Sequence, residues 1–151
     1  FNSIKRWVLM KIEKILLPFD GSVHSVNAAK YALNLAKLFE AHVTIVNCYE
    51  WNVSILEVPS PLIKDLESIC KKNAEDILKP AGEIFADRGI EYQLETIYGS
   101  PSRVLANLAK NKEYDLIIMG SHGHSDIAGL FLGSVTHKVL NTIYCPVLVV
   151  P

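Results

Sequence analysis

Short hydrophobic runs alternate with segments of helical periodicity along most of the chain. The runs have the length of β-strands, and they predict five of them: Ile12–Phe19, His42–Cys48, Glu91–Tyr98, Leu116–Met119 and Val147–Val150. Between these runs, apolar residues recur every three or four positions, which is typical of amphipathic helices. Strands separated by helices require right-handed crossovers. The pattern therefore predicts an α/β domain with an open, mainly parallel sheet and helices on both faces.

The first two helices are predicted from apolar spacing and from proline. Alanine and leucine recur at helical intervals in Ser25–Glu40, which we expect to form the first helix. Pro59 and Pro61 mark a loop, and a long helix is expected to follow it and to end near Gly89. Pro80 lies inside this helix, so we expect a kink or a division there.

The last two helices have recognisable first residues. Ser100 followed by Pro101 is a good helix start, because proline fits the first turn. Ser134 can cap a final helix with its hydroxyl. We therefore expect a helix before the fourth strand and another before the fifth.

Composition restricts the class of protein. The chain has 151 residues, of which 50% are hydrophobic and 21% are charged, as in one globular domain. Fifteen basic and sixteen acidic residues leave a net charge of −1, which argues against binding to duplex nucleic acid. The apolar runs are too short to span a membrane. Three cysteines without a CxxC pair argue against a zinc site or a disulfide framework and fit a reducing cytoplasm.

The first nine residues differ from the remainder. They read FNSIKRWVL and precede Met10, which opens the segment MKIEKILLPFDGS. The apolar stretch after Lys5 and Arg6 is too short for a signal peptide. We expect residues 1–9 to be an expression remnant, upstream readthrough or a disordered arm, and residues 10–151 to form the domain.

Two polar segments follow predicted strands directly. Asp20-Gly21-Ser22 follows the first strand, and a loop with glycines at Gly120 and Gly123 follows the fourth. In parallel sheets, ligands bind at the carboxyl ends of strands, where the winding direction changes. We therefore expect a ligand between the first and fourth strands.

The glycine loop suggests an anion site. Gly120 and Gly123 would let the backbone turn with its N–H groups directed into a concavity, which suits anions. Gly133 and Ser134 open a helix, whose unpaired N–H groups attract phosphate. The two features predict a ligand with several phosphates, although the Walker pattern GxxxxGK[ST] is absent. The alternative is a glycine turn followed by an ordinary capped helix.

Four segments resemble the universal stress protein family: ILLPFDGS at Ile15–Ser22, IIMGSHG at Ile117–Gly123, LGSVTHKVL at Leu132–Leu140 and CPVLVV at Cys145–Val150. The spacing Gly120-x2-Gly123-x9-Gly133-Ser134 is similar to the signature of the ATP-binding branch of that family. The resemblance extends from Met10 to the end of the chain. It implies a Rossmann-like, five-stranded parallel sheet in the order 3-2-1-4-5 and a homodimer joined through the C-terminal strand.

The resemblance also implies roles for individual residues. Asp20 should meet the ribose hydroxyls, and Gly120 should contact the ribose region. Pro18 and the backbone of Cys48 should border the adenine, with Met119 against its face. The phosphates should be held by N–H groups and hydroxyls of five residues: Gly123, Gly133, Ser134, Val135 and Thr136. Mg²⁺ or Mn²⁺ would be held mainly by the phosphates of ATP.

Several of these residues have a second interpretation. Asp20 could instead cap the following helix. His122, His124 and Ser125 could approach the phosphates, or the histidines could be solvated; a metal held by the histidines without a third protein ligand is not expected. Small core side chains are expected for the three cysteines, Cys48, Cys70 and Cys145. Two aromatic residues after the second strand could cover the adenine or pack the loop, namely Tyr49 and Trp51.

The functional hypotheses fall into different classes. The favoured one is an ATP-binding universal stress protein that changes state or partners with its nucleotide. The second is a slow ATPase or a self-phosphorylating enzyme with Ser134 or Thr136 as acceptor, for which Asp126, His122 and His124 are the available bases. The third is a dimeric interaction protein without nucleotide, against which the intact glycine spacing argues.

Overall fold

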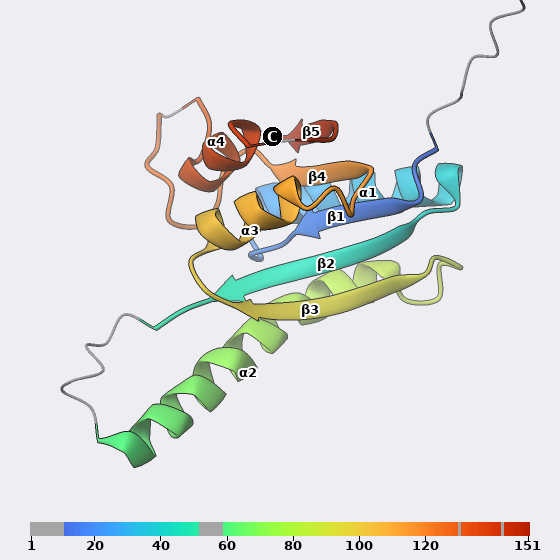
Figure 1. The fold of residues 1–151 in the computed structure, drawn as a ribbon. Coiled ribbons are helices and arrows are strands. Elements are labelled where there is room, and N and C mark those ends of the chain that lie inside the picture. The colour runs from blue at the N-terminus through green and yellow to red at the C-terminus, as the bar shows by residue number, and fades with distance from the viewer. Residues whose placement is uncertain (1–10, 52–58, 130, 143) are drawn as a thin grey trace, which may run out of the picture.

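The computed structural model describes residues 11–51, 59–129, 131–142 and 144–151. Strands and helices alternate throughout these residues (Figure 1). They are, in chain order, β1 (Lys14–Pro18), α1 (Val23–Phe39), β2 (His42–Tyr49), α2 (Ser60–Phe85), β3 (Tyr92–Tyr98), α3 (Pro101–Lys110), β4 (Leu116–Gly120), α4 (Ser134–Leu140) and β5 (Val147–Val150). Residues 1–9, expected to be a remnant or an arm, lie outside the described residues.

All five strands belong to one parallel sheet with the order β3-β2-β1-β4-β5, which confirms the predicted fold. The chain moves outward from β1 through β2 to β3, and then returns to the other side of β1 to form β4 and β5. The winding direction therefore changes between β1 and β4. The carboxyl ends of the strands and the 121–133 loop lie at the same edge of the sheet, on the left in Figure 1.

The central strands of the sheet are buried on both faces because their residues alternate between two apolar clusters. On one face, Ile15 and Leu17 pack with the alanines of α1 and with Leu78 and Phe85 of α2. On the other face, Leu16 packs with residues of α3, α4 and β4. Nearly continuous apolar sequence in the central strands follows from this double burial.

Ser22, not Asp20, caps α1. The Ser22 hydroxyl accepts a hydrogen bond from the Ser25 N–H at 3.2 Å, so α1 begins at Val23, two residues earlier than predicted. The alternative role of Asp20 as a helix cap is thus wrong. Strand β1 is shorter than predicted, because its pairing with β2 begins at Lys14 and ends at Pro18.

Prolines stand at the start and in the interior of α2. The helix begins at Ser60, with Pro61 in its first turn, so this part of the predicted loop is helical. Proline fits there because the first N–H groups of a helix have no intrahelical partner. Pro80 does not divide the helix, which continues to Phe85. Leu78 and Ala81, on either side of Pro80, are buried against the sheet and hold both parts in place.

The start of α4 also differs from the prediction. Gly133 is the N-cap, with extended backbone and no capping side chain, and Ser134 is the first helical residue. The predicted capping role of Ser134 is wrong, because its hydroxyl donates to a carboxylate in the preceding loop instead.

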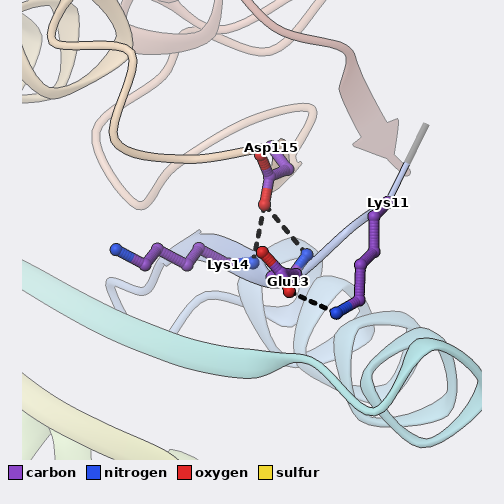
Figure 2. A network of polar contacts seen from close by, with 4 residues as sticks. All are labelled: Lys11, Glu13, Lys14 and Asp115. Atoms are coloured by element: carbon purple, nitrogen blue, oxygen red, sulfur yellow. Dashed lines mark hydrogen bonds and ion pairs between the residues drawn. The ribbon is translucent and has the colours of Figure 1, made fainter. Parts of the chain in front are cut away.

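Asp115 joins the amino ends of β1 and β4, at the opposite edge of the sheet from the loop. Its Oδ2 atom accepts hydrogen bonds from the backbone N–H groups of Glu13 and Lys14, each at 2.9 Å (Figure 2). Lys11 forms an ion pair with Glu13 nearby. Among the described helices, none combines the length and hydropathy that a transmembrane segment needs.

Candidate functional site

A cavity of about 520 Å³ lies at the carboxyl ends of β1, β2 and β4. This volume is in the range of small-molecule sites. All predicted site residues except Gly133 line it: Pro18, Asp20, Cys48, Met119, Gly120, His122, Gly123, His124, Ser125, Ser134, Val135 and Thr136. The structure therefore gathers these residues, far apart in the sequence, around one cavity at the predicted edge of the sheet.

Asp20 connects the two polar segments of the cavity. Its Oδ1 atom accepts a hydrogen bond from the Ser22 N–H at 3.0 Å, and its Oδ2 atom accepts one from the His124 N–H at 3.0 Å. Desolvation raises the pKa of this half-buried carboxyl, but hydrogen bonds from Ser22, His124 and Ser25 together outweigh it. The pKa of Asp20 is consequently lowered, and the carboxylate is charged at neutral pH.

A second carboxylate, Asp126, lies at the other end of the 121–133 loop. Its Oδ2 atom accepts a hydrogen bond from the Gly123 N–H at 2.5 Å. Its Oδ1 atom accepts from the Ser134 N–H at 3.0 Å and from the Ser134 hydroxyl at 3.2 Å. We call these three donors the anion nest. Asp126 was expected in the phosphate region as a possible base, but its hydrogen bonds to these donors were not predicted, because loop closure sets them.

The anion nest determines the charge of Asp126. Partial desolvation raises its pKa. The hydrogen bonds from Gly123 and Ser134 and the nearby His122 together lower the pKa by more than desolvation raises it. The net shift is downward, so Asp126 is a carboxylate at neutral pH. The nest therefore binds an anion in this structure, and that anion belongs to the chain itself.

The three glycines of the motif are needed for space. None of the three has a left-handed backbone conformation, so each is explained by the space around it. A Cβ atom on Gly123 would lie 2.7 Å from Asp20 Oδ2, and one on Gly133 would overlap Asp126 Oδ2. Two of the glycines thus make room for carboxylates.

Thr136 supports the strand beneath the cavity. Its buried hydroxyl donates a hydrogen bond to the carbonyl oxygen of Gly120 at 2.9 Å. In this arrangement the hydroxyl proton of Thr136 is donated to the backbone and not to a ligand. Thr136 therefore joins α4 to the end of β4 and fixes the position of the loop between them.

The histidines of the loop have different surroundings. His122 Nδ1 lies 3.0 Å from the Ser121 hydroxyl, and the His122 ring lies 5.4 Å from that of His24 on α1. His124 is exposed at the mouth of the cavity. Within the part of the chain that the structure describes, no three His, Cys, Asp or Glu side chains gather as a metal centre.

The apolar end of the cavity lies at the ends of β1, β2 and β4, with residues of α2 and α3 beside it. Pro18, Cys48 and Met119 line it from the sheet, and their contact with adenine stays a prediction. The wall from α2 was not predicted, because the helix is amphipathic along its whole length and only tertiary packing shows which positions face the cavity. That wall consists of Cys70, Asn73, Ala74 and Ile77.

The expectation of small core side chains holds in part for the cysteines, because Cys48 and Cys145 pack against the second apolar cluster. Cys48, Cys70 and Cys145 are free and only partly buried. Burial nevertheless raises the pKa of the Cys48 thiol to about 12. Cys48 and Cys70 both line the cavity, where their small side chains leave room for a ligand.

Tyr49, at the end of β2, and Trp51 pack with a third aromatic residue, Tyr98 at the end of β3. The ring of Tyr98 lies 5.8 Å from that of Tyr49 and 5.1 Å from that of Trp51. Tyr49 also lines the cavity, whereas Trp51 does not. The packing alternative therefore describes Trp51 in this structure.

Known proteins with the same fold are similar along nearly the whole chain. The universal stress protein family model matches residues 11–151. Universal stress protein MJ0531 of Methanocaldococcus jannaschii is 35% identical over 151 residues, which cover 99% of this chain and 88% of that protein. A structure of hypothetical protein MJ0577 superposes with a TM-score of 0.78 at 27% identity, covering 93% of this chain and 96% of that one. A universal stress protein in complex with cAMP superposes with a TM-score of 0.68 at 28% identity, covering 93% and 98%.

Proposed function

The chain belongs to the universal stress protein family, and from this premise we propose that it binds an adenine nucleotide at the carboxyl ends of β1 and β4. The observation that carries the proposal is the form of the cavity. It is apolar between Cys48 and Met119 and ends at an anion nest made of backbone and hydroxyl donors. A nucleotide changes in the same way along its length, from an apolar base at one end to charged phosphates at the other. The relative bound to cAMP supports this class of ligand.

We assign the adenine to the apolar end, between Pro18, Met119 and the backbone of Cys48. Asp20, at the centre of the cavity, would accept hydrogen bonds from the ribose hydroxyls near Gly120. The phosphates would lie against the 121–133 loop and the first turn of α4, near His122, His124 and Ser125. There, backbone N–H groups of Gly123, Ser134 and Val135 are the donors, while Gly133 leaves space and Thr136 holds the loop.

ATP is the nucleotide that we propose, with Mg²⁺ or Mn²⁺ held mainly by its phosphates. The reason is the length of the polar end, which extends from Asp20 to the far side of the loop. A divalent cation keeps most of its ligands from phosphate and water, and so it needs few protein ligands. The protein would then act as a stress or signalling module that differs between its nucleotide-bound and free states. We place it in the cytoplasm, where the three free cysteines would stay reduced.

One contact favours a second candidate function, self-phosphorylation. Asp126 Oδ1 accepts a hydrogen bond from the Ser134 hydroxyl, which is the arrangement of a base and an acceptor. The lowered pKa of Asp126 makes it a weak base, however, and catalysis needs a base with a pKa nearer to neutrality. We therefore favour binding over turnover. Steady-state hydrolysis of Mg-ATP should be far slower than the roughly 1–100 s⁻¹ of kinases, and fast turnover abolished by Asp126→Ala would reverse this order.

We also propose a homodimer formed through β5. This strand lies at the edge of the sheet and consists of four apolar residues, Val147–Val150. An edge strand has unpaired backbone groups that can pair with another chain. Antiparallel pairing of two copies about a two-fold axis would cover both edges. Sedimentation at about tens of micromolar should show a dimer. A monomer at that concentration would contradict the proposal.

Calorimetry with ATP and with adenosine tests the nucleotide site. Asp20→Ala should weaken both ligands by a similar factor, because it removes the ribose contact. Asp115→Ala is the matched control, since it deletes another carboxylate that accepts two backbone hydrogen bonds, at the opposite edge of the sheet (Figure 2). It should leave both affinities unchanged. Absence of binding by the folded wild-type protein, together with no nucleotide in mass spectra of freshly purified protein, would refute the proposal.

A further inference from the structure

Asp126 occupies the part of the cavity where the proposed function requires phosphate. Its two carboxylate oxygens accept hydrogen bonds from all three donors of the anion nest. A phosphate oxygen needs the same N–H and O–H protons, each of which points to one acceptor. Carboxylate and phosphate therefore cannot use the nest together.

The space around the nest leads to the same conclusion. The Asp126 carboxylate overlaps the position of a Cβ atom on Gly133, and Oδ2 lies 3.5 Å from that of a Cβ on Gly123. Asp126 thus takes the volume left free at Gly133 and lies in contact with the volume at Gly123, which Asp20 Oδ2 approaches more closely. A phosphate entering the same volume would also meet a negative charge at contact distance, which is strongly unfavourable.

We propose that Asp126 is a specificity-determining residue that competes with the ligand's phosphates for the anion nest. The inference rests on the proposed function, because it concerns the phosphate end of the nucleotide site. A phosphate-bearing ligand binds only after Asp126 has left the nest, whereas a nucleoside binds without displacing it. Asp126 therefore lowers the affinity for ATP relative to adenosine.

The competition is effective because Asp126 is tethered. It lies three residues from Gly123 and eight from Ser134, so its carboxylate is present at the nest at a high effective concentration. The short tether also means that displacement needs only a rearrangement within the 121–133 loop. The sheet and the apolar end of the cavity stay as they are, so adenosine binding should be independent of Asp126.

Calorimetry on the full chain with ATP, tripolyphosphate and adenosine tests the proposal. Asp126→Ala should bind ATP and tripolyphosphate at least about tenfold more tightly than wild type, and adenosine within about twofold of wild type. Asp126→Asn keeps the side-chain shape and a carbonyl acceptor but loses the charge, so it should show a smaller gain. Asp115→Ala, which removes a comparable carboxylate far from the nest, should change none of the three affinities. Circular dichroism establishes that each variant is folded.

The outcomes separate this inference from the nucleotide proposal. Tripolyphosphate carries no adenosine, so a gain in its affinity on Asp126→Ala would support the competition even if no nucleotide bound. Unchanged or weaker tripolyphosphate binding to folded Asp126→Ala would overturn the competition, whether or not ATP binds. An equal gain for adenosine and ATP would also overturn it, because the effect would then not concern phosphate. Loss of ATP binding on Asp126→Asn would overturn it as well, since Asp126 would then assist the ligand.

Discussion

Gly120, at the end of β4, lies directly against His24 in the first turn of α1. A Cβ atom on Gly120 would be 2.8 Å from the His24 Cβ and 2.9 Å from its carbonyl carbon. The absence of a side chain at Gly120 therefore lets α1 approach the sheet. This first glycine of the motif has a packing function that is independent of any ligand.

Gly120→Ala should consequently destabilise the protein. Overpacking a rigid site costs about 1–3 kcal/mol, and the atoms in the way here are Cβ and backbone atoms that cannot rotate aside. Chemical denaturation measures the loss. Gly82→Ala in α2 is the matched control, because its new Cβ would meet only the end of the flexible Leu94 side chain at 3.2 Å. It should be close to neutral, since alanine also favours the helix.

A second substitution shows whether this explanation is correct. His24→Ala retains the Cβ and the backbone that crowd Gly120, so it should not rescue Gly120→Ala. Rescue would mean that the imidazole ring, and not the helix backbone, determines the spacing between α1 and β4.

The parallel sheet and the edge that holds the site could be predicted from the residues, and the order of strands from the family resemblance, whereas the reasons for several residues could not. Alternating strands and helices restrict the topology strongly, and the polar segments after β1 and β4 identify the edge. A glycine in the sequence does not reveal whether it serves backbone conformation, packing or a ligand. Gly120 is explained by His24, which is distant in sequence, and Gly133 by Asp126, which lies across a loop. Likewise Asp20 and Ser22 are both good cap residues, and only the hydrogen bonds distinguish them.

The two carboxylates of the site should make stability depend on acid. The pKa values of Asp20 and Asp126 are both lowered in the folded protein from an ordinary value of 3.8. As the pH falls, these carboxylates therefore bind protons at a higher pH in the unfolded chain than in the folded protein. The stability that they contribute is complete above the ordinary pKa and is lost as the pH falls through their pKa values in the folded protein.

Denaturation midpoints between about pH 7 and pH 3 measure this effect. Asp20→Asn and Asp126→Asn should each lower the stability at pH 7 and reduce the decrease on acidification. The double substitution should have the flattest profile. An acid dependence as steep as that of wild type in the double variant would show that other groups dominate.

Cys48 should react slowly with alkylating reagents although it lines the cavity. Burial raises its pKa to about 12, so only a very small fraction is thiolate at neutral pH, and the thiolate is the reactive form. Peptide mapping after brief iodoacetamide treatment should find little modification at Cys48 in the folded protein. Urea-unfolded protein is the control, in which Cys48 should be modified at an ordinary rate. Rapid modification in the native state would contradict the assigned burial.

Gly123→Val should weaken ATP binding at least about tenfold, a decade corresponding to about 1.4 kcal/mol. Its Cβ would meet Asp20 Oδ2 at 2.7 Å, and the branched side chain would fill the anion nest. Adenosine, which has no phosphates, should lose less affinity. Calorimetry with both ligands compares the two losses. Equal losses would mean that the loop shapes the cavity without holding phosphate.

Gly133 and Asp126 should be energetically coupled. In Gly133→Ala the new Cβ overlaps the Asp126 carboxylate, so Asp126 must leave the nest and its hydrogen bonds are lost. Once Asp126→Ala has removed that carboxylate, the nearest remaining backbone atom is the His122 Cα at 3.1 Å, which a small shift can accommodate. Gly133→Ala should therefore destabilise the Asp126→Ala protein less than it destabilises wild type.

A double-mutant cycle by chemical denaturation measures this coupling, which should be about 0.5–3 kcal/mol, as for residues in contact. The control cycle combines Asp126→Ala with Gly120→Ala, whose obstacles are His24 and Ser25 and not Asp126. That pair should be additive. Coupling in the first cycle alone would mean that the third glycine of the motif is retained for an anion in the nest. Additivity in both cycles would mean that Gly133 is needed for the backbone of His122, and that the position of Asp126 has no part in fixing it.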